Sequence, residues 1–189
     1  MATKIRDLSK PLNIPGGDNL IAPLDEIAQG SPRAAVIVGS ALLEDALRWC
    51  LCGYLIPRGY RIALPAEDQN AVFDNETAPL NTFHTKIVMG YSLGIYGKIT
   101  RDDLYRIKRV RNVFAHSFRP ITFDTSAVAK ECLGLRYLHM LIAKKSREPL
   151  QNANDPRYMF IHTARMMIIH LHSLGIPKKS RKSFMGRMP

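Results

Sequence analysis

The chain has 189 residues, of which 46% are hydrophobic and 23% charged, and its 27 Lys and Arg against 16 Asp and Glu give a net charge of +11. This length suits one domain, and the hydrophobic fraction excludes a disordered chain. No stretch reaches the roughly 18 uninterrupted apolar residues of a membrane span, and the N-terminus lacks the apolar block of a secretory signal. We therefore expect a cytoplasmic protein that does not engage a membrane.

The cysteines and histidines show no metal-binding pattern. The chain has three cysteines, Cys50, Cys52 and Cys132, and their spacing matches neither a zinc site nor a C-x-x-C redox motif. We interpret them as reduced thiols in the core. The histidines near the C-terminus have no carboxylate or third ligand at suitable spacing. The sequence therefore predicts neither a metal nor a cofactor.

The composition divides the chain into three parts. Residues 1–30 are rich in Pro and Gly and are predicted to be an extended arm with one helical turn around 24–28. Residues 31–175 are predicted to form a single helical-bundle domain. Residues 176–189 carry five basic and no acidic side chains and are predicted to be a mobile basic tail.

The first two helices of the central part are expected from their end signals. Ser31 can cap a helix in which Pro32 occupies the first turn, and this helix should stop before Pro57. Residues 58–79 are expected to form a long connection. A second helix is predicted over 82–95, with Asn81 as its cap.

Three further helices complete the predicted all-α bundle. The third is expected to begin at a capping box over 100–103, with a buried stripe of Leu104, Ile107, Val110 and Phe114. The fourth should be one helix capped by Asp124 or Ser126 and carrying Val128, Cys132, Leu135, Leu138, Leu141 and Ile142. The fifth should start at Asp155-Pro156 and end before Gly175-Ile176-Pro177, with its Met-rich apolar part in the core or at a dimer interface. No credible run of alternating strand residues is present.

The positive charge is concentrated in two stretches. Residues 98–119 contain seven basic side chains and only two acidic ones, Asp102 and Asp103. In the tail, every charged side chain is basic. Local positive charge of this kind favours a polyanion, either nucleic acid or an acidic protein partner, although two solvated basic faces are an alternative. The candidate nucleic-acid-binding residues are Arg106, Lys108, Arg109, Arg119, Lys178, Lys179, Arg181 and Lys182.

The segment 111–117 carries the candidate chemistry. On a helix, Asn112 and His116 are four residues apart and share a face, whereas Arg111 points about 140° away from His116. The three side chains converge only if the helix distorts or a second subunit contributes, as in a two-fold dimer. Such a set could cut RNA without metal, with His116 moving protons and Arg111 stabilising phosphate charge. The same residues also suit a helix C-terminus, and Glu44 could reach Arg111 across the bundle.

Several ordered blocks of residues resemble one protein family. They are 79–83 (Pro-Leu-Asn-Thr-Phe), Lys86-Ile87, 91–95 (Tyr-Ser-Leu-Gly-Ile), Asp103-Leu104, 111–117 (Arg-Asn-Val-Phe-Ala-His-Ser) and 121–124, with the upstream helix 33–47. Over about residues 31–135 they resemble the mannitol operon repressor family. The resemblance implies an all-α bundle involved in transcriptional regulation, without a DNA-reading motif of its own. This chain likewise shows no helix-turn-helix or zinc finger.

The spacing from Arg111 and Asn112 to His116 is separately similar to the signature of HEPN domains. Those domains are helical bundles that often form dimers and act as metal-independent ribonucleases, although inactive members only bind RNA or protein. That similarity implies Arg111, Asn112 and His116 as active-site positions.

Three functional hypotheses follow from the sequence. The first is a dimeric regulatory protein that engages nucleic acid, with RNA favoured over sequence-specific DNA, or an acidic protein partner. The second is a metal-independent endoribonuclease, and the third is a protein-interaction module that does not bind nucleic acid.

Overall fold

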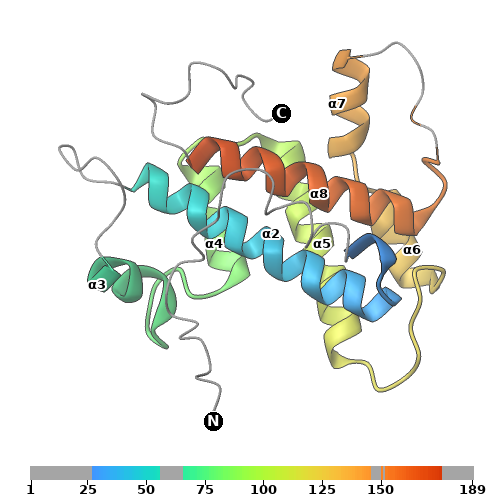
Figure 1. Cartoon of the computed structure of the whole chain (residues 1–189), viewed down its shortest axis with the longest axis horizontal. Helices are drawn as coiled ribbons and strands as arrows, with labels where there is room; N and C mark the ends of the chain where they lie inside the picture. Colours follow the sequence, from blue (N-terminus) through green and yellow to red (C-terminus); the bar gives the residue numbers. More distant parts are fainter. Residues whose placement is uncertain (1–26, 56–65, 146–149, 151, 176–189) are drawn as a thin grey trace, which may run out of the picture.

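The computed structural model describes residues 27–55, 66–145, 150 and 152–175, and within these ranges the chain is helical and contains no strand (Figure 1). The expected all-α class is confirmed. The helices are α2 (Pro32–Tyr54), α3 (Ala66–Gln69), a π-helical turn η1 (Asn70–Asp74), α4 (Phe83–Ser92), α5 (Lys98–His116), α6 (Ser126–Leu133), α7 (Tyr137–Lys145) and α8 (Pro156–Gly175). None of these helices has the length and apolarity that crossing a membrane requires. The predicted tail and nearly all of the predicted arm lie outside the described residues.

Helices α2 and α8 form the central pair of the bundle and run parallel, side by side (Figure 1). At their N-terminal ends, Nη2 of Arg157 donates to the carbonyl oxygen of Gly30 at 2.6 Å. At their C-terminal ends, the rings of Trp49 and His172 stack with centroids 5.5 Å apart. Most apolar residues of α8, including Met159 and Met167, are buried in the core, whereas Ile169 is 36% exposed, so this helix is confirmed as part of the core.

Both central helices begin where the sequence predicts. Pro32 occupies the first turn of α2, and the Ser31 hydroxyl accepts a hydrogen bond from the backbone N–H of Ala34 at 3.2 Å. At the start of α8, Oδ1 of Asp155 accepts from the backbone N–H of Arg157 at 2.9 Å. These side chains satisfy amides that the first turn of a helix leaves unpaired.

Helices α4 and α5 form an antiparallel hairpin, and both differ in their ends from the sequence prediction. Thr82, rather than Asn81, caps α4 and forms a reciprocal capping box with Thr85. The helix ends at Ser92 instead of 95, because Gly94 takes a left-handed conformation with φ of 65°. Asn81 instead donates from Nδ2 to the carbonyl oxygen of Glu76 at 2.8 Å.

The capping box predicted at 100–103 is wrong. Helix α5 begins at Lys98, with Gly97 as its cap and no capping side chain, so Thr100 and Asp103 lie inside the helix and are buried. The predicted apolar stripe is nevertheless confirmed, since Leu104, Ile107, Val110 and Phe114 are each at most 2% exposed.

The single helix predicted to start near residue 126 is two helices, α6 and α7. The helix is interrupted near Gly134, where an added Cβ atom would lie only 2.5 Å from Nη1 of Arg106. Beyond the break, Oδ2 of Asp103 accepts hydrogen bonds from the backbone N–H groups of Arg136 at 2.8 Å and Tyr137 at 2.7 Å. Asp103 therefore caps α7 rather than its own helix. Neither Asp124 nor Ser126 caps α6, whose cap residue is Thr125, and the Thr125 side chain accepts no hydrogen bond from the first turn of α6.

The three cysteines are buried and form no disulfide bond, as the sequence predicts. Burial raises the pKa of the Cys52 thiol to about 11 and that of Cys132 to about 12, so both thiols stay protonated at neutral pH. Within the described ranges, no group of three or more His, Cys, Asp or Glu side chains could hold a metal ion.

The buried Asp103 carboxyl should make stability depend on pH. Burial of the carboxyl raises its pKa to about 6. The hydrogen bonds that it accepts from two backbone N–H groups offset only part of this increase. The folded protein then binds more protons than the unfolded chain between about pH 4 and 6, so this contribution to stability is lost as pH rises through 6.

We predict that the free energy of unfolding of the wild type, relative to Asp103→Asn, is higher at pH 5 than at pH 7 by about 1 kcal/mol. Urea unfolding at the two pH values measures this difference. The exposed Asp124→Asn variant is the control and should show no such change. If the difference in the free energy of unfolding between the wild type and Asp103→Asn were the same at both pH values, the raised pKa of Asp103 would be contradicted.

Candidate functional site

The Glu44 carboxylate of α2 binds two cations from two other helices. Its Oε1 accepts a hydrogen bond from Nζ of Lys86 on α4 at 2.8 Å, and its Oε2 accepts from Nη1 of Arg111 on α5 at 2.9 Å. We call these three residues the Glu44 centre. The sequence-based expectation that Glu44 reaches Arg111 is thereby confirmed, whereas the role of Lys86 was missed.

The three side chains of the Glu44 centre differ in solvent exposure, with Lys86 the most buried and Arg111 the most exposed. The side chain of Lys86 is 6% exposed, that of Glu44 16% and that of Arg111 35%. Nζ of Lys86 also donates to the carbonyl oxygen of Asn81 at 3.3 Å, so the buried ammonium group has two oxygen acceptors. A buried lysine requires such partners because an isolated charge is very costly away from water.

A surface pocket opens above the Glu44 centre, and we call it the Arg111 pocket. It has a volume of about 410 Å³. Its walls come from α2, from the start of α4 and from α5, through Glu44, Asn81, Thr82, Phe83, His84, Lys108, Arg111 and Asn112. Lys108, Arg111 and Asn112 are three and four residues apart on α5 and therefore share one face of that helix.

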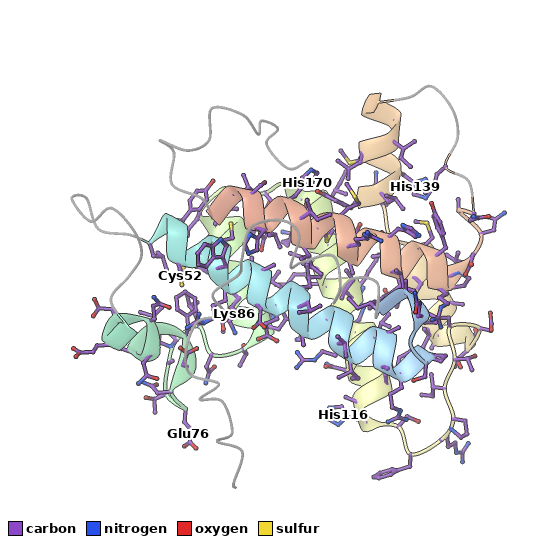
Figure 2. The ribbon with its side chains drawn as sticks, viewed as in Figure 1. Cys52, Glu76, Lys86, His116, His139 and His170 are labelled. Atoms are coloured by element: carbon purple, nitrogen blue, oxygen red, sulfur yellow. The ribbon has the colours of Figure 1, made fainter. Side chains whose placement is uncertain are left out.

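The three candidate catalytic residues are not gathered in one place within the chain. Arg111 and Asn112 line the Arg111 pocket, but His116 is not among its lining residues. His116 is exposed in the last turn of α5, and Figure 2 shows it at one end of that helix, away from Lys86. The fully exposed Phe118 follows it closely in the chain. A composite site with a second subunit stays a prediction.

The candidate nucleic-acid-binding residues of α5 have unequal surroundings. Arg106 donates to Glu131 of α6 at 2.8 Å, and Arg109 donates to both oxygens of the same carboxylate at 2.9 Å. The pKa of Glu131 is lowered, chiefly by its hydrogen bond with Arg109. In contrast, Lys108 makes no ion pair within the described part of the chain, and Arg119 is exposed beyond the helix. The four candidates in the tail lie outside the described residues.

A mixed aromatic and basic surface runs along the α4 and α5 hairpin from its tight turn to the Arg111 pocket. We call it the α4–α5 face, and it consists of His84, Val88, Tyr91, Arg101, Tyr105 and Lys108. The Arg101 guanidinium lies 4.4 Å from the centroid of the Tyr91 ring, and the rings of His84 and Tyr105 are 5.6 Å apart. Val88 and Tyr91 are 43% and 38% exposed, although both are large and apolar.

Comparison with known proteins relates this chain to a solved structure. One chain in the X-ray structure of the MtlR–HPr complex from Escherichia coli matches with a TM-score of 0.60 and 12% sequence identity. The match covers 81% of this chain and 98% of that one. The chain has an MtlR-like fold. No family model and no curated protein sequence matches it. The HEPN-type motif therefore has no support beyond the spacing of its residues.

We predict that Glu44→Gln strongly destabilises the protein. The substitution leaves Lys86 buried without a charged partner, and breaking one side of a buried ion pair costs about 3–5 kcal/mol. Urea unfolding monitored by circular dichroism measures the loss. Glu76→Gln makes the same chemical change at an exposed carboxylate and should alter the free energy of unfolding by less than about 0.5 kcal/mol. Equal effects of the two substitutions would contradict a structural role for the Glu44 centre.

Proposed function

We propose that this chain is a non-catalytic regulatory protein that acts by binding a protein partner. The observation that carries the proposal is the fold match, which extends over nearly the whole of a chain taken from a complex of two proteins. The resemblance of residues 31–135 to the mannitol operon repressor family supports the regulatory part of the proposal. HPr, which forms the complex with the similar chain, is the first partner to test.

The α4–α5 face has the composition expected of a surface that binds a protein. Tyr and Arg are enriched in protein interfaces and contribute a large share of their binding energy. Tyr91 and Arg101 are in contact here, next to the exposed Val88. Lys98 and Lys108 add positive charge at the two ends of the face, which favours a partner with an acidic surface.

Two features favour a protein partner over RNA. Proteins that bind single-stranded RNA offer open aromatic faces for base stacking, whereas one face of the Tyr91 ring is covered by Arg101. An extended chain of phosphates also requires a track of available cations, and Arg106 and Arg109 are both engaged by Glu131.

We predict that the purified chain binds purified HPr with micromolar affinity, measured by isothermal titration calorimetry. Arg101→Glu should weaken binding at least about tenfold, because it replaces the cation that lies over the Tyr91 ring with an anion. Lys130→Glu makes the same charge change on α6, away from this face, and should bind as the wild type does. No binding at high protein concentration, or equal weakening by both substitutions, would contradict the proposal.

A second candidate function is metal-independent RNA cleavage by a homodimer. It is favoured by the exposure of His116, Phe118 and Arg119 together at the end of α5, since an exposed aromatic ring beside a histidine and an arginine suits a bound nucleotide. A second subunit would have to bring Arg111 and His116 together.

If this second candidate is correct, labelled RNA incubated with the protein in EDTA is cut, and His116→Ala abolishes cutting without changing the melting temperature. Light scattering should then give the mass of a dimer at micromolar concentration. Intact RNA at high protein concentration would exclude the enzyme, and a monomer mass would exclude the composite site.

A further inference from the structure

The Arg111 pocket contains more positive than negative charge. Glu44 is the one acidic residue among those lining the pocket, and both of its carboxylate oxygens are already bound by Lys86 and Arg111. Lys108 also lines the pocket and makes no ion pair with any described residue. The pocket with the Glu44 centre beneath it therefore carries three cationic side chains and one carboxylate.

Arg111 is oriented so that it can bind a second acceptor. Glu44 engages only its Nη1 atom, and the side chain is 35% exposed at the wall of the pocket. A guanidinium group has five N–H donors in a fixed planar arrangement, so Nη2 and Nε can donate elsewhere. The contact with Glu44 fixes the position of the guanidinium, which reduces the conformational entropy lost when a ligand binds.

Lys108 and Asn112 flank Arg111 on the same side of α5. Lys108 precedes Arg111 by three residues and Asn112 by four. An ammonium group, a guanidinium group and an amide are therefore close together at one wall of the pocket. Three donors of this kind match the oxygens of a phosphate, for which charge-assisted hydrogen bonds from Arg and Lys are especially strong. Asn81 and His84 on the opposite wall offer polar groups for the rest of a ligand, whereas the Thr82 hydroxyl is engaged in its capping box.

We propose that the Arg111 pocket binds the phosphate group of a small phosphorylated molecule. Its volume of about 410 Å³ falls in the range of small-molecule sites, which is roughly 300–1,000 Å³. A nucleic acid is disfavoured, because Arg106 and Arg109 of the same helix are paired with Glu131 and do not extend the cationic surface along α5.

A neighbouring hollow indicates that only one end of the ligand is anionic. This hollow shares Glu44 and Asn81 with the Arg111 pocket but is also lined by Asp45, Asp74 and Glu76. Of its two basic side chains, Arg48 is paired with Asp74 and Lys86 with Glu44. A second phosphate at that side would meet carboxylates, so the site favours a monophosphate.

The proposal is independent of the protein partner, and it is tested on the full chain alone. Glycerol 3-phosphate and inorganic phosphate are titrated by isothermal titration calorimetry, with sodium chloride holding the ionic strength constant. We expect saturable binding of both probes, and Lys108→Gln should weaken it about tenfold, as the loss of one charge-assisted hydrogen bond predicts. Lys130→Gln removes an equivalent exposed charge from α6 and should leave binding unchanged.

Lys108→Gln is the deciding variant because Lys108 makes no ion pair that the fold requires, and an unchanged melting temperature verifies that the variant is folded. Arg111→Gln should also lose binding, but it alters the Glu44 centre as well. A ten-residue oligouridylate serves as the competing probe. Absence of glycerol 3-phosphate binding, equal binding by Lys108→Gln and the wild type, or tighter Lys108-dependent binding of the oligouridylate would each overturn the proposal.

Discussion

The Glu44 carboxylate connects three helices by binding Lys86 and Arg111 at the same time. Because the Lys86 side chain is almost fully buried, a shift of the helical hairpin of α4 and α5 that broke its contact with Glu44 would leave a buried charge unpaired. The apolar stripe of α5 stabilises the same interface, but apolar contacts are not directional and do not fix the orientation of the helices. The two hydrogen bonds of Glu44 therefore determine how the hairpin sits on α2, and with it the shape of the Arg111 pocket and of the α4–α5 face.

This constraint also separates the functional hypotheses. Arg111 is held toward α2 and the pocket, whereas His116 lies exposed in the last turn of the same helix. One chain thus offers a cationic pocket and a mixed aromatic and basic face, both of which suit binding without chemistry. Cleavage of RNA requires a second subunit in addition. The match to a chain from the MtlR–HPr complex shows the fold. The α4–α5 face is the surface that we propose contacts a protein partner.

Local signals predicted the starts of α2 and α8, whereas the division into α6 and α7 depends on a residue far away in the sequence. Ser31-Pro32 and Asp155-Pro156 mark true helix starts, because a cap and its amides are only a few residues apart. The split between α6 and α7 was not predictable in this way, since the cap of α7 is Asp103, more than thirty residues upstream. The site shows the same pattern. Glu44 and Arg111 were recognised as a possible pair by charge, but Lys86 follows no pattern that distinguishes a buried lysine from an exposed one.

A double-mutant cycle between Glu44 and Arg111 tests the central claim most directly. Glu44→Gln, Arg111→Gln and the double variant are compared with the wild type by urea unfolding. If the contact joins α2 to α5 as described, the two substitutions are not additive, and the coupling free energy is about 1–3 kcal/mol in favour of the native pair. Additivity within about 0.5 kcal/mol would mean that the two charges act independently, and would contradict the account.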